Sequence, residues 1–204
     1  MFDFDAGLPA EIVPLSWLLG VWEGTGVLSY RIGDDVRDAE FGQRVAFTHD
    51  GTPHVQYVSS SWLIDPSSEA AEAVAPLYSE IGYWRLSRAL GDGDQGPGML
   101  PAVGEPLFTN AEAVETLRNE RGAFELEVAI VQPGGVSEIY LGEVNGPRID
   151  LATDAVVRTA TAKEYAAATR IYGLVDDHLL WAWDIAALGQ DLRTHSSGRL
   201  TRVE

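Results

Sequence analysis

Short segments in which apolar and polar residues alternate recur along almost the whole chain, and this period of two constrains the fold more than any other feature. Alternation of this kind places successive side chains on opposite faces of a β-strand. We therefore predict about ten strands. The segments with this alternation, or with β-branched and aromatic enrichment, are 21–30, 41–47, 55–64, 77–86, 124–131, 137–144, 149–157, 167–174, 179–185 and 192–203.

Short turn sequences separate many of these segments. DGTP at 50–53, PGG at 133–135, NGP at 145–147 and VDD at 175–177 are typical of hairpin connections. Connections this short cannot hold the crossover helices that a parallel sheet requires. The sequence therefore predicts an all-β fold, an antiparallel up-and-down barrel of about ten strands, like the lipocalin and fatty-acid-binding barrels.

Three segments break the strand pattern. VPLSWLLG at 13–20 predicts a short N-terminal helical turn that ends at a glycine, and 31–38 reads as a charged loop. A longer stretch, 89–121, begins with turn-forming residues and ends with a sequence that favours one or two helical turns. We expect residues 1–204 to form a single barrel domain with this long loop inserted at about 89–121.

Composition limits the partners of such a barrel. The formal net charge of −17 at pH 7 would repel phosphate backbones and anionic lipid, so we expect neither nucleic acid nor membrane as a partner. The chain has no cysteine, which excludes disulfides, thiolate metal ligands and a cysteine nucleophile. Acidic residues at 1–5 differ from the basic start of a signal peptide, so the expected location is cytoplasmic.

The stretch LLGVWEGTG places Gly20, Trp22, Gly24 and Gly26 at intervals of two, on one face of the first predicted strand. This spacing differs from that of a dinucleotide-binding loop. Glycine allows a strand to bend and a neighbouring backbone to approach closely. We therefore interpret the motif as architectural, with Trp22 closing one end of a cavity that a ten-stranded barrel is wide enough to hold.

With this motif the chain resembles the nitrobindins, haem-binding relatives of the fatty-acid-binding barrels. The resemblance continues in order through PLYSEIGYWR at 76–85, TAKEYAAATRIYGLV at 161–175 and LLWAWDIAALGQDLRTHSSGRL at 179–200. It covers residues 12–203 apart from the loop at 89–121. It implies ferric haem b at the open end of the barrel, with His195 as its axial ligand and Lys163 beside a haem propionate.

The resemblance also implies an activity, the isomerisation of peroxynitrite to nitrate, together with nitric oxide binding at the ferric haem. In the implied scheme the iron acts as a Lewis acid, the O–O bond breaks, and the fragments recombine within the pocket. No protein general acid is required. The sequence agrees with this, because it lacks the metalloprotease, phosphate-binding and serine-hydrolase motifs.

Four histidines can be compared as haem ligands, since imidazole is a common axial ligand and thiolate is absent. His49, His54 and His178 lie at turn sequences, where a solvated surface role is the ordinary interpretation. His195 lies within the last predicted strand. From the residues alone it also reads as a surface histidine, and the resemblance is what selects it as the ligand.

The chain departs from the family pattern around the expected site. Ser196 follows His195 where many members carry an apolar residue, and Tyr78 stands where the central strand often carries histidine. Ser196 or Ser197 could hydrogen-bond the second imidazole nitrogen and so tune the ligand.

These departures leave an alternative function open. The alternative is a haem-free barrel that binds a fatty-acid-like or other apolar molecule without catalysis, with the 89–121 loop as its lid or portal. A homodimer is compatible with either function.

Overall fold

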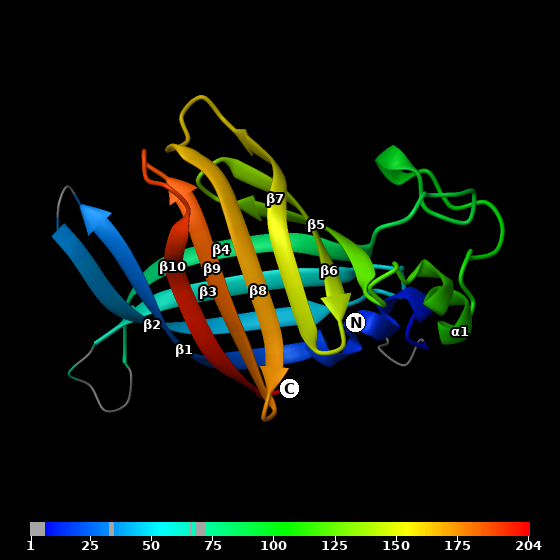
Figure 1. Ribbon diagram of the computed structural model, residues 1–204, viewed down its shortest axis with the longest axis horizontal. Coiled ribbons are helices and arrows are strands. Elements are labelled where there is room, and N and C mark those ends of the chain that lie inside the picture. The colour runs from blue at the N-terminus through cyan, green and yellow to red at the C-terminus, as the bar shows by residue number, and fades with distance from the viewer. Residues whose placement is uncertain (1–6, 33–34, 66, 68–71) are drawn as a thin grey trace.

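The computed structural model describes residues 7–32, 35–65, 67 and 72–204, and all ten predicted strands are present in it. Each strand pairs antiparallel with its neighbours in the sequence, and the last strand pairs with the first to close the barrel (Figure 1). The predicted ten-stranded antiparallel barrel is confirmed. The strands are β1 (Gly20–Ile32), β2 (Asp35–Thr48), β3 (Val55–Ile64), β4 (Ala73–Leu86), β5 (Phe124–Gln132), β6 (Val136–Asn145), β7 (Arg148–Arg158), β8 (Tyr165–Val175), β9 (His178–Ala187) and β10 (Arg193–Arg202).

The prediction of a charged loop at 31–38 is wrong. The β1–β2 ladder continues through it, with Tyr30 opposite Arg37 and Ile32 opposite Asp35, and residues 33–34 lie outside the described residues. The side chains at 35–38 are all exposed, so this part of the hairpin buries neither face. It therefore shows no apolar alternation from which a strand can be predicted.

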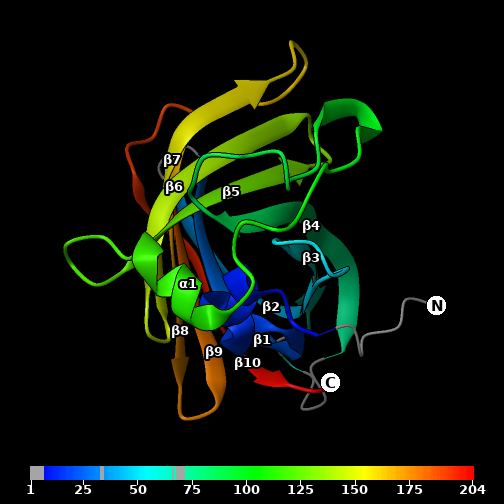
Figure 2. The same ribbon diagram turned by 90° about the vertical axis from the view of Figure 1, so that its right-hand side faces the viewer.

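The predicted N-terminal helical turn is present as a 3-10 helix, η1 (Ala10–Leu18). It lies across one end of the barrel together with the segment that joins β4 to β5 (Figure 2). The other end carries the β7–β8 and β9–β10 connections (Figure 1). The two ends therefore differ, one closed by helical segments and the other bounded by hairpin connections. No helix in the described part of the chain is long and apolar enough to cross a membrane.

Trp22 of β1 seals the closed end, as the sequence predicts. Its side chain is buried with Ile12, Leu15 and Leu18 of η1. The indole Nε1 donates a 2.7 Å hydrogen bond to the main-chain oxygen of Leu18. The guanidinium of Arg202 from β10 lies 4.5 Å from the ring centroid. Trp22 thus joins the helix to the barrel through burial, a hydrogen bond and a cation–π contact.

The glycines that follow Trp22 allow close contact in the wall. A Cβ atom at Gly24 would overlap the main-chain oxygen of Arg199 on β10, and one at Gly26 would overlap the ring of Phe41 on β2. A side chain at either position would push the neighbouring strand or ring away. This agrees with the architectural interpretation of the motif.

The segment between β4 and β5 contains two 3-10 turns, η2 (Pro97–Met99) and η3 (Glu115–Leu117), and a short helix, α1 (Ala111–Val114). The helical turns predicted in its second half are therefore confirmed. The expectation that 89–121 forms a lid or portal is wrong, because none of these residues lines the barrel cavity and the segment packs at the closed end (Figure 1). Sequence composition indicated a long loop without indicating which end it covers.

Arg88 fastens this segment to the N-terminal helix. Its guanidinium binds the Glu11 carboxylate of η1 and forms two hydrogen bonds to Asp94, of 2.7 and 2.6 Å. The side chains of all three residues are at least nine-tenths buried. The hydrogen bond from Arg88 lowers the pKa of Asp94 to about 2. The carboxylate therefore stays ionised, and the contact holds, until the pH falls well below the ordinary range of aspartate.

We predict that Arg88→Met destabilises the protein by about 3 kcal/mol, because it leaves two buried carboxylates without their cation. The free energy of unfolding in urea measures the effect. Arg148→Met removes an exposed pair with Asp150 on β7 and serves as the control, with an expected loss of about 0.5 kcal/mol. Equal losses in the two variants would contradict the role of Arg88.

Candidate functional site

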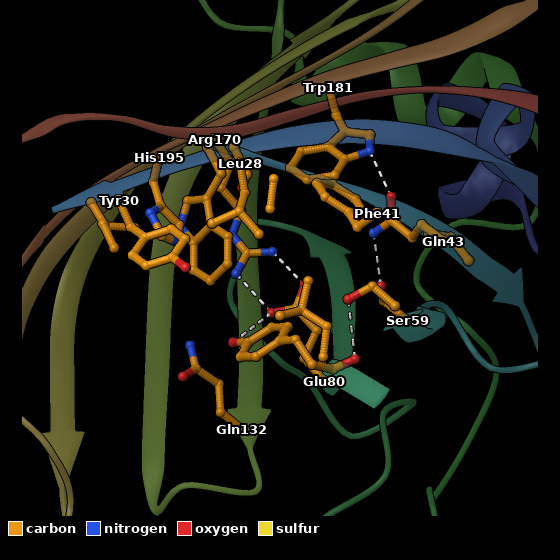
Figure 3. A pocket seen from close by; sticks show the side chains of 18 of the residues that line it. Leu28, Tyr30, Phe41, Gln43, Ser59, Glu80, Gln132, Arg170, Trp181 and His195 are labelled. Carbon is orange, nitrogen blue, oxygen red and sulfur yellow. Dashed lines mark hydrogen bonds and ion pairs between the residues drawn. The ribbon is translucent and has the colours of Figure 1, made fainter. Parts of the chain in front are cut away.

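A cavity of about 500 Å³ occupies the half of the barrel away from η1. Its wall is mostly apolar and aromatic, with a few polar side chains that project inward (Figure 3). Four alternate residues of β9 line it, namely Leu179, Trp181, Trp183 and Ile185. A cavity of this size and character suits a small organic ligand or cofactor.

Two paired glycines shape one side of the cavity. Gly26 of β1 lies opposite Gly198 of β10, and the residues next in register are Phe41 on β2 and Trp181 on β9. A Cβ atom at Gly198 would lie 2.6 Å from the Trp181 Nε1 atom. Because neither glycine has a side chain, the two rings lean over them and meet, with centroids 6.0 Å apart. Four adjacent strands thus form a continuous aromatic surface.

A chain of uncharged hydrogen bonds lies beside this surface. The Trp181 Nε1 donates to the Gln43 Oε1 at 2.8 Å, and the Gln43 Nε2 donates to the Ser59 Oγ at 3.0 Å (Figure 3). Gln43 and Ser59 are both buried. The bonds fix the orientation of the Trp181 ring without adding charge to the cavity.

His195 lies in β10 at a β-bulge. Thr194 pairs with Asp184 and Ser196 pairs with Trp183, so His195 has no partner on β9. In a regular strand His195 and Ser196 would face opposite sides, but here both line the cavity. The extra residue therefore turns the imidazole inward, a use of bulges that is common beside functional sites.

The surroundings of His195 favour a neutral imidazole. Burial lowers its pKa below the ordinary value of 6.5, and the nearby Arg193 lowers it further. The main chain of Ser29 acts in the opposite direction and raises the pKa. A neutral imidazole carries a lone pair on one ring nitrogen, and a metal ion can bind there.

Trp183 supports the imidazole from β9. Its ring meets His195 edge to face, with centroids 5.9 Å apart. The Arg170 guanidinium lies 4.2 Å from the Trp183 ring centroid, and the Tyr78 ring lies 5.6 Å away. Trp183 thus fills the space between the buried cation and the candidate ligand.

Arg170 lies at the centre of a buried polar network. Its Nη1 and Nη2 atoms donate to the two oxygens of Glu80 at 2.6 and 2.8 Å, and its Nε donates to the Tyr140 hydroxyl at 2.9 Å. Weaker contacts reach the Tyr172 hydroxyl at 3.4 Å and Glu138 at 3.7 Å. Burial disfavours the Glu80 carboxylate, but Arg170 and the bonded phenols outweigh it and lower the pKa of Glu80. We therefore treat Arg170 as a structural cation rather than an anion-binding group.

Glu138 of β6 is the second carboxylate of this network and is completely buried. It accepts hydrogen bonds from Gln132 at 2.7 Å and from the hydroxyls of Tyr140 and Tyr165, both at 2.5 Å. Sequence reasoning missed Glu80, Glu138 and Arg170. The only available signal was a glutamate or an arginine at a strand position that alternation assigns to the interior.

The Tyr165–Glu138 bond strengthens a weak seam in the wall. The β7–β8 ladder extends only from Arg148 to Ala152. Beyond it, the Thr153 hydroxyl substitutes for a ladder group, because it accepts from the Ala168 amide at 3.0 Å. Tyr165 of β8 reaches past β7 to Glu138 of β6, so side-chain bonds replace the missing backbone bonds.

The structure places the other predicted residues as follows. Lys163 lies in the β7–β8 connection at the open end, is exposed and does not line the cavity. Its main-chain oxygen accepts a hydrogen bond from Arg158 at 3.2 Å. Ser196 is buried at the cavity, and Ser197 does not line it. Tyr78 lines the cavity.

The remaining histidines lie at turns, as the sequence predicts, and these turns are at the closed end of the barrel. His49 and His54 flank the β2–β3 connection, and His178 begins β9. His54 contacts the Tyr83 ring, with centroids 5.1 Å apart, and His178 contacts the Asp176 main-chain oxygen at 2.6 Å. Among the described residues, His195 is therefore the one histidine that lines the cavity.

These features match a known family. Residues 11–202 match the family described as the THAP4-like, heme-binding beta-barrel domain. The chain belongs to this family. The match confirms the resemblance to haem-binding barrels and covers every strand.

Proteins with closely similar sequences carry the name peroxynitrite isomerase. One from Leifsonia xyli subsp. xyli is 63% identical over 204 residues, with all of both chains covered. One from Clavibacter michiganensis subsp. michiganensis is 61% identical with the same coverage. Another, from Kocuria rhizophila, is 50% identical and covers 99% of this chain and 95% of its own.

A solved structure has the same fold. The crystal structure of Rv2717c from M. tuberculosis superimposes with a TM-score of 0.65 at 26% sequence identity. The superposition covers 97% of this chain and 99% of that one.

The cavity meets the requirements of a haem site. Haem needs a strong axial ligand, an apolar enclosure and an opening for its carboxylates. His195 supplies a neutral imidazole, and the rings of Phe41, Trp181 and Trp183 supply the enclosure. The lining extends toward the strand ends away from η1, where Tyr30 of β1 and Leu63 of β3 lie. Haem is the cofactor of the family, and the residues present fit it.

We predict that the free energy of unfolding of the haem-free protein decreases as the pH is lowered, partly because of His195. Because the folded-state pKa lies below 6.5, the unfolded chain takes up a proton first as the pH falls. The contribution is complete above about pH 6.5 and is lost as the pH falls toward the lowered value. Unfolding in urea at about pH 7.5 and about pH 5.5 should therefore show a larger loss in the natural protein than in His195→Gln. Identical losses would contradict the inferred surroundings of His195.

Proposed function

We propose that this protein is a haem-dependent peroxynitrite isomerase in which His195 holds the iron and the barrel cavity confines the reacting fragments. Family membership and the names of full-length relatives support the cofactor and the activity. One observation carries the assignment of the ligand. The bulge between Thr194 and Ser196 turns a single neutral imidazole into an apolar cavity that no other histidine lines.

The haem supplies an electrophilic iron at which peroxynitrite reacts, and the chain supplies the surroundings. Burial keeps the His195 imidazole neutral, and the Trp183 ring packs against it edge to face. Phe41 and Trp181 form an apolar wall that keeps water away from reactive fragments. The fragments therefore recombine to nitrate before they meet another partner.

The cavity offers no general acid, in keeping with an isomerisation that needs none. Glu80 is paired with Arg170, and Glu138 already accepts three hydrogen bonds. Burial raises the pKa of the Tyr78 phenol, and Glu80 raises it further, so Tyr78 stays neutral and keeps its proton. The residues thus stabilise the site without donating a proton during the isomerisation.

Cations at the open end have a separate role. The net charge of −17 repels an anionic substrate at long range. Lys163 and Arg158 lie in or beside the β7–β8 connection, and Arg193 begins β10. We assign Lys163 to a haem carboxylate. These cations offset part of that repulsion near the open end, where Glu164 and Asp191 lie in the same two connections.

Four finer assignments belong to the same proposal. Nitric oxide binds at the same ferric iron, the protein works in the cytoplasm, and its surface charge keeps nucleic acid and membranes away. A homodimer forms through the outer face of β3–β5. Val58, Ile81 and Val131 lie side by side there, and each is about half exposed, at 49%, 57% and 48%.

We predict that His195→Ala lowers haem affinity by about a hundredfold or more, since changes to groups that merely orient a ligand already cost about 10–100-fold. Titration of purified protein with hemin, followed by the Soret absorption band, measures the affinity. Peroxynitrite decay and nitrate yield should fall with the bound haem. His178→Ala is the matched control and should bind haem like the natural protein. Full affinity in His195→Ala would overturn the assignment.

We also predict that Lys163→Glu weakens haem binding by roughly fivefold, because an exposed ion pair is worth about 1 kcal/mol or less. Lys163→Arg keeps the charge and should bind normally. The same hemin titration at low and high salt tests this, and the difference should shrink as salt screens the pair. If the Glu variant binds as well as the Arg variant, Lys163 is not a carboxylate partner.

A second candidate function, the storage of an apolar ligand without catalysis, is favoured by the mostly apolar wall and the uncharged Gln43–Ser59 bond. Native mass spectrometry of the protein as purified separates the two functions. A lipid mass in place of a haem mass would support this alternative.

A further inference from the structure

Five tyrosines line the cavity, and only some are accessible to a small reagent. Tyr57, Tyr165 and Tyr172 are at least nine-tenths buried, with exposures of 2%, 8% and 4%. Tyr30 and Tyr78 are half-buried and have part of their surface open. A reactive fragment released inside the cavity therefore meets these two phenols first.

Tyr78 is joined to the candidate iron ligand through one ring. The Trp183 ring contacts His195 on one side and Tyr78 on another, with centroids 5.9 and 5.6 Å away. The Tyr78 hydroxyl donates a 3.3 Å hydrogen bond to the Glu80 carboxylate. A phenol gives up an electron more readily when a bonded acceptor can take its proton, and Tyr30 has no such bond among the described residues.

Trp183 is a poor target although it lies nearer to His195. The Arg170 guanidinium over its face opposes any gain of positive charge on the indole. Its Nε1 has no hydrogen-bond partner among the described residues, so the N–H proton has no acceptor. Tyr78 is therefore oxidised more readily than Trp183.

We propose that Tyr78 is a self-nitration site, modified by the small fraction of substrate whose fragments escape recombination. The proposal rests on the proposed peroxynitrite activity. In the net step the O–O bond of peroxynitrite breaks and its nitrogen bonds to a ring carbon next to the Tyr78 hydroxyl. The displaced ring proton leaves with the remaining oxygen as hydroxide. Peroxynitrite supplies both oxidising equivalents, so no further oxidant is needed.

The modification would act on the site itself. A nitro group on Tyr78 adds bulk and polarity beside Trp183, which supports His195. It also lowers the pKa of the phenol, and a phenolate beside the Glu80 carboxylate is disfavoured by charge repulsion. Nitration thus loosens the packing that supports His195. It also marks protein molecules in which fragments have escaped recombination.

Peptide mass spectrometry after treatment of haem-loaded protein with peroxynitrite tests the proposal. We expect the nitro group on Tyr78, and its loss in Tyr78→Phe without transfer to Tyr30. Tyr30→Phe is the matched control and should leave the Tyr78 modification in place. Tyr83 is 56% exposed on the outer face of β4 and reports nitration by reagent in bulk solution.

Haem-free protein and His195→Ala complete the design, and nitrate yield is measured in the same samples. In both, nitration should shift from Tyr78 to Tyr83. If haem-loaded protein forms nitrate but is nitrated mainly at Tyr30 or Tyr83, or if Tyr78 is nitrated equally without haem, the proposal fails and the function stands. If haem has no effect on either nitrate yield or the nitrated positions, the proposed function fails with it.

Discussion

The bond between Arg170 and Glu80 holds the interior of this barrel together. The two residues come from β8 and β4, on opposite parts of the wall, and both are almost completely buried. Two parallel hydrogen bonds join them, and Tyr140 of β6 and Trp183 of β9 contact the same guanidinium. Removal of either partner would leave a buried charge unpaired, which is far more costly than loss of a surface pair.

This interaction also explains how the cavity acquires its chemistry. The guanidinium is surrounded by acceptors and therefore holds Trp183 in place without attracting a ligand. The indole in turn supports His195, which the bulge in β10 has turned inward. The closed end is stabilised separately by Trp22 and by the Arg88 contact, so the open end is left free for a cofactor.

The sequence predicts the strands well because period-two alternation and hairpin turns are local signals. Val55–Ile64 matches its predicted bounds, and the other strands extend by a few residues at one or both ends or, for β10, begin and end one residue inside them. The β1–β2 hairpin beyond Tyr30 could not be predicted, since the side chains at 35–38 are exposed and carry no apolar alternation. Placing the loop between β4 and β5 requires tertiary contacts such as Arg88–Glu11, which join residues far apart in the chain.

Less of the candidate site could be predicted from local sequence patterns. Alternation would place His195 on the face opposite Ser196, and a bulge that depends on pairing with β9 reverses this. Only the family resemblance selected His195 from the sequence. The Arg170–Glu80–Glu138 network was missed, because its members lie on three strands whose register cannot be read from one sequence.

A crystal structure of the haem-loaded protein tests the central claim most directly. The account predicts that a ring nitrogen of His195 binds the iron, and that the Trp183 ring keeps its contacts with His195 and with the Arg170 guanidinium. An iron held by Tyr30, Tyr78 or another residue, or a haem outside the barrel cavity, would contradict it.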